Sequence, residues 1–489
     1  MSKPRLWLQL FEREAGRGLG RREQLCASLR QAMRAGELEL GERLPASRVL
    51  AADLGLSRVT VEAAYGQLEA EGYVNRAVGR GSFVAIASGA GGQRKRPSPA
   101  APRIAPLSRR GQLITATGGC EDPLQPRAFA AGSPDLRAFP LALWRQLLNR
   151  RLRSDAALLG YGDPQGHPAL REAIAGYLCQ SRGLRCRAEQ VLVLTSSQQA
   201  LQLCATLLLD AGDALWMEEP GYRGARTAFA AAGAAIVPVP LDAEGLCPPA
   251  GAAAPRLIYL TPSHQYPCGM ALSLPRRLAL LGLARQDSRC FIIEDDYDSE
   301  FHYEGRPMPA LQGLDEAGRV LYVGTFSKVL FPSLRLAYLV LPEALVQPFT
   351  VARSVQDGHS AQLPQAVAAD FISQGHFAAH LRLMRQLYRE RRAVLQEALS
   401  SLGWLSAQPS AGGLQLAALL PQGQEAAYSR AAAARGIATP SLSALYAGTP
   451  AQDGWLLGYA ALTPEEIRQA VAALAPIGTS PGRRPRLRT

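Results

Sequence analysis

The stretch Thr325-Phe-Ser-Lys-Val-Leu-Phe-Pro-Ser-Leu-Arg335 holds the residue from which the rest of the chain is interpreted. Of the 53 basic residues only three are lysines, and Lys328 is the only one of these beyond residue 95. Arginine cannot replace lysine where a deprotonated amine must attack an aldehyde, because guanidinium keeps its proton at any ordinary pH. A lysine withdrawn from water loses its charge and becomes such a nucleophile. We therefore predict that Lys328 forms a Schiff base; the alternative is a lysine retained by chance, with its stem packed on apolar surface.

A second segment supplies the carboxylates that such chemistry requires. Phe291-Ile-Ile-Glu-Asp-Asp-Tyr297 is typical of a short buried strand that ends in acidic residues and a tyrosine. Pyridoxal phosphate needs a carboxylate against its pyridine nitrogen, so that the ring acts as an electron sink. Its phosphate needs hydroxyl and guanidinium donors, which Thr325 and Arg335 supply on either side of the lysine. The acidic segment alone is equally typical of a solvated strand end, but together the two segments predict a pyridoxal phosphate site.

Composition places the chain among globular proteins. Its 489 residues, 47% hydrophobic and 19% charged, predict two or three domains with a substantial core. We recognise no apolar run of membrane-spanning length and no signal peptide. The eight cysteines show neither Cys-x-x-Cys nor Cys/His ligand spacing, which favours reduced thiols and no metal site. These features predict a cytoplasmic protein without membrane contact.

The net charge of +12 is unevenly distributed along the chain. Residues 119–480 carry 30 basic and 31 acidic residues, so the excess lies in residues 1–85, 86–118 and 481–489. Such a distribution favours contact with a polyanion. A basic run in a linker is also often only solvated, so the charge supports this interpretation without deciding it.

Within residues 1–85, the pattern from residue 19 onward predicts three helices. The first helix is indicated by apolar residues at helical spacing, and Gly36 ends it. These apolar residues are Leu25, Leu29, Ala32 and Met33. Ser47 and Ser57 are placed to cap two further helices, which are separated by a tight turn at Gly55. Two capped helices joined by a glycine-containing turn make a helix-turn-helix. A plain three-helix bundle is the alternative.

The second helix of this pair is the predicted reading element. Arg58 and Thr60 lie at its N-terminal end, which in a helix-turn-helix enters the major groove. Arginine is the side chain that most often reads a base there. Tyr73–Val84 is then predicted to form a hairpin wing, with Arg76 and Arg80 near its tip.

This arrangement resembles the GntR-type winged helix. The matching stretches are Leu44-Pro-Ala-Ser-Arg48, Ala51-Ala-Asp-Leu-Gly-Leu-Ser-Arg58, Thr60-Val61, Tyr65, Leu68-Glu-Ala-Glu-Gly-Tyr73 and Gly79-Arg-Gly-Ser-Phe-Val84. The resemblance implies that Ser47 and Arg48 contact the DNA backbone, and that the wing around Arg80 and Gly81 reaches the adjacent groove. It places Ser57, Arg58 and Thr60 at the start of the recognition helix. The implied partner is double-stranded operator DNA.

The remainder of the chain divides into a linker, a large domain and a tail. Residues 86–118 are rich in Pro, Gly, Ala and Arg, a composition that predicts a flexible basic linker. Residues 119–480 alternate short β-branched runs with Ala/Leu-rich stretches, which predicts an α/β domain with a largely parallel sheet. The predicted strands are Gln190–Leu194, Ala214–Met217, Ala235–Val239, Leu257–Leu260, Phe291–Ile293 and Val320–Val323. Thr195-Ser-Ser-Gln198 follows the first strand and opens a helix, where a phosphate is favoured. Residues 481–489 are a basic tail.

The large domain resembles the fold-type I aminotransferases, and the whole chain is similar to the MocR subfamily of GntR regulators. The motifs are Phe129-Ala-Ala-Gly-Ser-Pro-Asp135, Tyr161-Gly-Asp-Pro-Gln-Gly166, Glu219-Pro-Gly-Tyr222, Thr261-Pro-Ser-His-Gln-Tyr-Pro267, Glu294-Asp-Asp-Tyr-Asp-Ser-Glu-Phe301 and Gly324-Thr-Phe-Ser-Lys328. The resemblance implies that Lys328 carries the cofactor as an aldimine, that Asp295 pairs with the pyridine nitrogen, and that Tyr297 bonds the phenolic oxygen. It also implies that the phosphate is held by Ser196, Ser197, Thr325 and Arg335, joined by Tyr161 of the other subunit of a homodimer. Tyr222 would lie beside the ring.

Together these features predict a pyridoxal-phosphate-dependent transcription regulator whose aminotransferase-like domain senses the cofactor itself or an amine or amino acid. The alternative is a working aminotransferase with an appended DNA-binding domain. In aminotransferases an arginine on a late strand grips the substrate carboxylate, and the resemblance puts Leu456 in its place. Leucine cannot bind a carboxylate, so we expect transamination of ordinary amino acids to be slow or absent. The sequence also leaves Arg223 as a possible anchor for an amine-bearing ligand.

Overall fold

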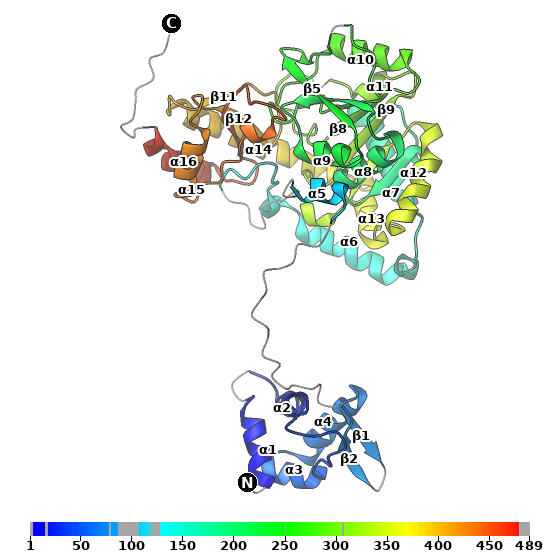
Figure 1. Cartoon of the computed structure of the whole chain (residues 1–489), viewed down its shortest axis with the longest axis vertical. Coiled ribbons are helices and arrows are strands. Elements are labelled where there is room, and N and C mark those ends of the chain that lie inside the picture. The colour runs from blue at the N-terminus through cyan, green and yellow to red at the C-terminus, as the bar shows by residue number, and fades with distance from the viewer. Residues whose placement is uncertain are drawn as a thin grey trace. The chain divides into compact units, whose positions relative to one another are not determined.

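A computed structural model describes residues 3–14, 18–77, 80–86, 107–116, 119, 128–249, 251–305 and 308–478. The chain divides into two compact units, residues 1–106 and 107–489 (Figure 1). Among the described helices, none combines the length and the apolar character needed to cross a membrane. Most of the linker predicted over 86–118 and the whole tail 481–489 lie outside the described residues.

The N-terminal unit is a winged helix-turn-helix preceded by one further helix. Its elements are α1 (Lys3–Glu12), α2 (Arg21–Ala35), α3 (Ser47–Leu54), α4 (Arg58–Ala70), β1 (Val74–Ala77) and β2 (Gly81–Val84). The two strands pair antiparallel. Gly36 and Gly55 end α2 and α3 with φ of 75° and 63°, a left-handed conformation that glycine adopts without steric cost. The predicted helices and wing are therefore confirmed. Helix α1 was not predicted, and its Trp7 and Leu10 pack into the core of this unit.

The predicted cap of α3 is wrong by one residue. Ala46 is the N-cap, and Ser47 is the first helical residue. The Ser47 hydroxyl donates to Glu62 of α4 instead of to its own helix. The cap of α4 is as predicted, because the Thr60 N–H donates to Ser57 Oγ at 3.0 Å. A tertiary contact with a carboxylate thus replaces the local cap of α3.

The C-terminal unit is built on an eight-stranded sheet of order β3-β10-β9-β8-β7-β4-β5-β6. The strands are β3 (Val191–Leu194), β4 (Ala214–Glu219), β5 (Ala235–Asp242), β6 (Gly245–Leu246), β7 (Leu257–Leu260), β8 (Phe291–Asp296), β9 (Val320–Thr325) and β10 (Ala337–Val340). Strands β5, β4, β7, β8 and β9 run parallel, whereas β10 is antiparallel to both of its neighbours. The largely parallel sheet is confirmed, and β10 and β6 are the strands that the sequence analysis missed.

Both faces of this sheet are buried. Along β3, Val191 and Val193 join one core cluster, whereas Leu192 and Leu194 join another, as strand alternation requires. The helices are α5 (Arg109–Ala116), α6 (Leu141–Ser154), α7 (Pro168–Arg182), α8 (Ser197–Leu208), α9 (Arg223–Ala231), α10 (Leu274–Gln286), α11 (Leu311–Leu314), α12 (Glu343–Asp357), α13 (Gln362–Ser373), α14 (His376–Ser400), α15 (Glu425–Ala433) and α16 (Pro464–Leu474). A smaller antiparallel sheet is formed by β11 (Ser406–Ala407), β12 (Gln415–Leu419) and β13 (Gly454–Gly458). Its strand β11 packs with α14, which also packs with α16.

Helix α5 corrects part of the linker prediction. Residues 109–116 were expected to be flexible, but they form a helix that lies beside α9 (Figure 1). No residue of α5 is buried. Its sequence therefore lacks the pattern of buried apolar residues that would indicate a packed helix. The contact with α9 is tertiary, and a short arginine-rich segment does not reveal it.

Candidate functional site

The antiparallel strand β10 brings three segments to one edge of the large sheet. Its first residue, Ala337, pairs with Leu194 at the end of β3 and with Thr325 at the end of β9. The chain that leaves β3, the chain that leaves β9 and the chain that enters β10 therefore meet at this edge. Five of the predicted site residues lie on these segments: Ser196, Ser197, Thr325, Lys328 and Arg335.

The amino group of Lys328 points at the backbone of Gly132. A Cβ added to Gly132 would stand 3.0 Å from Lys328 Nζ and 3.9 Å from Gln415 Oε1. Gly132 also has a φ of 69°, which favours glycine over any other residue. Lys328 itself is only partly exposed. The Lys328 amino group thus lies near Gly132 and Gln415, which are distant from it in sequence. Because Gly132 has no side chain, it leaves space for this amino group.

Asp295 offers a buried carboxylate near the end of β8. It is 5% exposed, and the Tyr259 hydroxyl donates to its Oδ2 at 2.7 Å. Burial raises the pKa of Asp295 to about 7, with a further increase from the negative charges of Asp296 and Asp298, while the bond from Tyr259 opposes the increase. A cation beside this carboxylate would reverse the shift. The residue therefore fits a protonated ring nitrogen.

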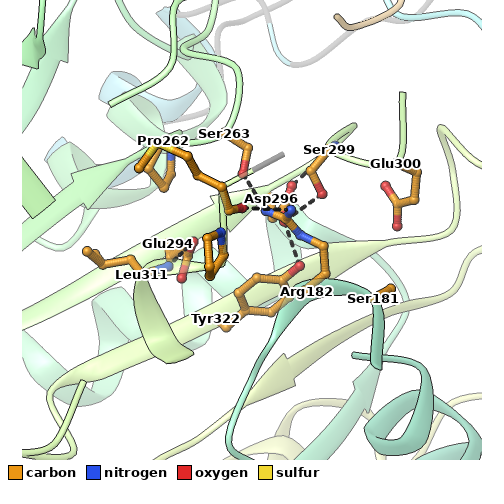
Figure 2. A network of polar contacts seen from close by, with 12 residues as sticks. Ser181, Arg182, Pro262, Ser263, Glu294, Asp296, Ser299, Glu300, Leu311 and Tyr322 are labelled. Atoms are coloured by element: carbon orange, nitrogen blue, oxygen red, sulfur yellow. Dashed lines mark hydrogen bonds and ion pairs between the residues drawn. The ribbon is translucent and has the colours of Figure 1, made fainter. Parts of the chain in front are cut away.

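The adjacent Asp296 lies on the opposite face of β8. Figure 2 shows it bonded to Arg182, Ser299 and Tyr322. Its Oδ2 accepts from Arg182 Nε at 3.0 Å, from the Tyr322 hydroxyl at 2.7 Å and from the Ser299 hydroxyl at 2.7 Å. Burial alone would raise the pKa of Asp296, but Arg182 and the two hydroxyls lower it below its usual value. This network fixes β8 from one face, so that Asp295 projects from the opposite face.

Three tyrosines form an aromatic group near the carboxylate of Asp295: Tyr222, Tyr266 and Tyr297. The ring of Tyr266 lies 5.9 Å from Tyr297 and 5.7 Å from Tyr222, edge to face in both cases. Burial raises the pKa of Tyr297 well above its usual value, so its hydroxyl remains a hydrogen-bond donor. Tyr222 is the N-cap of α9, which fixes the origin of its side chain. This geometry suits a flat ring, and Tyr266 is a member that the sequence analysis did not select.

The start of α8 and the turn before β10 fit a phosphate group. Ser196 is the N-cap of α8 and accepts from the Gln199 N–H at 3.1 Å, while Ser197 opens the helix with N–H groups that have no intrahelical acceptor. Arg335 is exposed and has a φ of 53°, a conformation that is rare outside glycine and marks functional positions. The Thr325 hydroxyl accepts from the Ser327 N–H at 3.1 Å.

Tyr161 does not join these residues within one chain. Its side chain is fully exposed and lies 6.0 Å from the His359 ring, measured between centroids. Other apolar side chains from η2 (Ala156–Leu159) and from α6 and α12 are also exposed: Leu141, Leu159, Val351 and Val355. Exposed aromatic and apolar side chains of this kind are typical of a surface that meets another chain.

The predicted DNA contacts fall into two groups. Arg48, Ser57, Arg58 and Arg80 are exposed, with Thr60 half-buried beside them. Val59, between Arg58 and Thr60, is 78% exposed, which suits contact with a thymine methyl group. Ser47 does not face solvent, because it is buried against Glu62, which also accepts from Arg76 at 2.5 Å. Gly81 has a φ of 108° and lies against the Arg43 guanidinium.

One buried group near the lysine escaped the sequence analysis. Asp298 is 1% exposed, and its Oδ1 bonds His264 Nδ1 at 2.8 Å. Its Oδ2 has no hydrogen-bond partner among the described residues. The acidic run from Glu294 to Glu300 is the signal that contained it, but that run does not reveal which carboxylates lie near the lysine. Within the described residues, no group of three or more His, Cys, Asp or Glu side chains is arranged to hold a metal ion.

Comparison with known proteins matches both units. Residues 21–84 match the gntR family of bacterial regulatory proteins, and residues 129–474 match the aminotransferases of class I and II. The chain is 40% identical to the probable rhizopine catabolism regulatory protein MocR of Rhizobium meliloti, with 92% of each chain covered. It is 30% identical to the pyridoxine biosynthesis transcriptional regulator PdxR of Corynebacterium glutamicum, over 92% of this chain and 94% of that one.

A solved structure supports the fold of the second unit. The α-aminoadipate aminotransferase LysN of Thermus thermophilus, complexed with N-(5'-phosphopyridoxyl)-L-leucine, is 31% identical with a TM-score of 0.66. The match covers 72% of this chain and 91% of that one. The regulators thus match nearly the whole chain, whereas the aminotransferase matches one unit.

Proposed function

The chain belongs to the MocR-type GntR regulators, in which a DNA-binding winged helix precedes an aminotransferase-like domain, and on that premise we propose that it binds pyridoxal phosphate at Lys328. As a transcription regulator it binds DNA through the N-terminal unit. We further propose that occupancy of the Lys328 site changes the affinity of the winged helix for its operator. The observation that carries the proposal is the meeting of Lys328, Asp295 and the start of α8 at one edge of the sheet.

Each predicted residue has a distinct task at this site. The Lys328 amino group attaches the cofactor, and Gly132 leaves space for that amino group. Asp295 holds a proton on the ring nitrogen, because a buried carboxylate strongly favours a cation beside it. Tyr297 would donate to the phenolic oxygen of the cofactor, and Tyr222 would lie beside its ring. When bound, the ring supplies an electron sink conjugated to the attached amine.

The phosphate is held by groups that the fold already presents. Ser196 and Ser197 stand at the N-terminus of α8, whose first N–H groups favour an anion. Arg335 adds a guanidinium, whose planar fork suits phosphate oxygens. The Thr325 hydroxyl completes the set from the end of β9.

A homodimer explains the position of Tyr161. Its ring is fully exposed, and apolar side chains of α6, η2 and α12 are exposed as well, which leaves surface that water solvates poorly. We propose that this surface meets a second copy, so that Tyr161 reaches the phosphate of the partner's site. Two winged helices in one dimer would then bind two operator half-sites.

The sensing proposal is tested by titrating apoprotein with pyridoxal phosphate while operator binding is followed by fluorescence anisotropy. The operator is a duplex selected from a random-sequence pool with the purified protein. Wild-type protein should change its operator affinity as cofactor binds, whereas Lys328→Arg should not, because it keeps the charge but cannot attach the cofactor. An unchanged affinity at saturating cofactor would overturn the sensing role of the cofactor itself and leave a second ligand as the signal.

The second candidate, a working aminotransferase, is favoured by the match of residues 129–474 to the class I and II aminotransferases and by the likeness to LysN. It is tested by mixing holoprotein with an amino acid and a 2-oxo acid and following multiple turnovers. We expect one half-reaction at most. Rapid turnover would show that the regulator is also an enzyme.

A further inference from the structure

The small sheet directs one face toward Lys328, and this face is apolar apart from Gln415. On β12, Gln415 and Ala417 lie on the same face, because side chains alternate along a strand. Gln415 Oε1 lies 3.9 Å from the point that also stands 3.0 Å from Lys328 Nζ, so this face is the one directed at the lysine. Ala417 pairs directly with Leu456 of β13. The wall opposite the lysine therefore carries Leu456.

This apolar wall extends beyond the two strands. Its buried members are Ala417, Leu442, Leu445 and Leu456, with Ala131, Tyr266, Leu419 and Tyr446 packed against them. Tyr266 also touches the rings of Tyr222 and Tyr297, and Ala131 immediately precedes Gly132. The wall is thus continuous with the aromatic group and with the glycine beside the lysine. A ligand attached at Lys328 would meet it.

The wall carries no cationic side chain among these described members. Arg226 reaches its edge, but its guanidinium donates to Leu445 O at 2.6 Å and lies 3.3 Å from Glu219. A ligand carboxylate placed on the wall would lose its water without gaining a cation, which disfavours binding strongly. An alkyl chain at the same place would bury apolar surface and gain from it.

One buried carboxylate oxygen near Lys328 has no hydrogen-bond donor among the described residues. Asp298 Oδ2 is buried without a partner among the described residues, and it lies 3.0 Å from the point where a Cβ on Gly413 would stand. Gly413 lies two residues before Gln415, whose amide oxygen is near the same Gly132 position as Lys328. His264 occupies only Oδ1 of Asp298. A buried acceptor without a donor is costly, so a ligand N–H or O–H would be favoured there.

We propose that the effector is a primary amine without a carboxylate, whose hydrocarbon lies on the apolar wall and whose second donor group is received by Asp298. This inference rests on the proposed function, because the first amine is the one that engages the cofactor at Lys328. It narrows the effector from amino compounds in general to amines, diamines and amino alcohols. Arg223, exposed at the start of α9, is not a member of the wall.

The test compares ligands that differ only in the carboxylate. Holoprotein is titrated by calorimetry with pentylamine and norleucine, and with 1,5-diaminopentane and lysine, while operator binding is followed separately. Each amine should bind at least roughly tenfold more tightly than its carboxylated counterpart, a ratio that corresponds to about 1.4 kcal/mol of binding free energy. The affinity for the diamine should exceed that for pentylamine, and operator binding should respond at a lower concentration of the tighter ligand.

Variants distinguish the contribution of the apolar wall to ligand binding from that of Asp298. Leu456→Arg should reverse the preference within the pentylamine and norleucine pair, whereas Leu457→Met, on the opposite face of β13, should leave it unchanged. Asp298→Asn should remove the advantage of the diamine over pentylamine and spare pentylamine. Arg223→Ala should not alter any of the ratios. Thermal melting and the visible absorption of bound cofactor report whether each variant is folded and loaded.

The wild-type titrations decide the matter even if Leu456→Arg does not fold. Norleucine binding as tightly as pentylamine, or no amine binding although the visible absorption is present, would overturn the inference and leave the cofactor proposal standing. Equal affinities for pentylamine and the diamine would overturn the role of Asp298. A protein without visible absorption after incubation with pyridoxal phosphate would overturn the proposed function itself, and the inference with it.

Discussion

The proposed DNA-contacting surface of the winged helix, with Arg48, Arg58 and Arg80, and the proposed site at Lys328 use charge in opposite ways. Arg48, Arg58 and Arg80 stand exposed in water, where a hydrated guanidinium costs nothing to keep until a phosphate or a base displaces the water. Asp295 and Asp298 are buried instead, so each must have a partner or a raised pKa. The exposed surface suits a large polyanion, and the buried one suits a small cationic group that is withdrawn from solvent.

The carboxyl groups of the two regions also differ in the direction in which their pKa values are shifted. In the winged helix, hydrogen bonds from Ser47 and Arg76 lower the pKa of Glu62. In the aminotransferase-like domain, burial raises the pKa of Glu218 to about 7, as it does for Asp295. Acid therefore removes a stabilising contact from the first region, whereas rising pH imposes a buried charge on the second.

The sharpest separation of the two regions comes from Lys328→Ala. The variant should lose all covalently held cofactor, because no other described residue lies at the meeting point of the three segments with an amine. Visible absorption and mass spectrometry after borohydride reduction measure this loss. Binding to a random duplex should remain near the wild-type level, since phosphate contacts belong to the other unit. Reduced cofactor on a different residue would contradict the assignment of Lys328.

Arg58→Ala tests the reading surface. Loss of a base contact should cost about 1–3 kcal/mol on the operator and relax sequence preference. Isotherms on operator and random duplex at one salt concentration measure the difference between the two. Equal losses on both duplexes would show that Arg58 contacts only the backbone.

Asp295→Asn tests the buried carboxyl through the pH dependence of apoprotein stability. The pKa of Asp295 is about 7 in the folded state and 3.8 when unfolded, so the folded state holds the proton more tightly. Its stabilising contribution is complete below pH 3.8 and is lost as the pH rises through 7. Between pH 5 and 7 wild-type apoprotein should lose about 2 kcal/mol more than the variant. Urea unfolding of the aminotransferase-like transition at both pH values measures this; parallel losses would place the proton elsewhere.

The smallest expected effect belongs to Arg48→Ala. If Arg48 contacts a phosphate, the variant should bind every duplex more weakly, and the slope of log affinity against log salt should fall by about one. Isotherms at several salt concentrations, on operator and random duplex, provide the slope. A loss confined to the operator would instead make Arg48 a reading residue like Arg58.

The sequence alone determined the elements whose signals are local. Ser57 capping α4, Gly36 and Gly55 ending their helices, and the β-branched runs of the parallel strands all depend on residues within a few positions of one another. The single lysine beyond the linker and the acidic end of β8 predict the chemistry of the site for a related reason. Residue type, rather than position in space, limits what an amine or a carboxylate can do.

Only the tertiary structure decided which side chains face the same space. Ser47 turns from its own helix to Glu62, and α5 is ordered beside α9, because partners distant in sequence compete with local preference. Asp295 and Asp296 are adjacent in sequence yet serve opposite faces of β8, one toward the site and one toward Arg182. We infer that strand pairing and loop packing bring Leu456, Asp298 and Gly132 near Lys328. Leu456 and Gly132 are more than a hundred positions from the lysine in sequence, whereas Asp298 is 30 positions from it. Such contacts follow from burial of the whole core, so no local pattern records them.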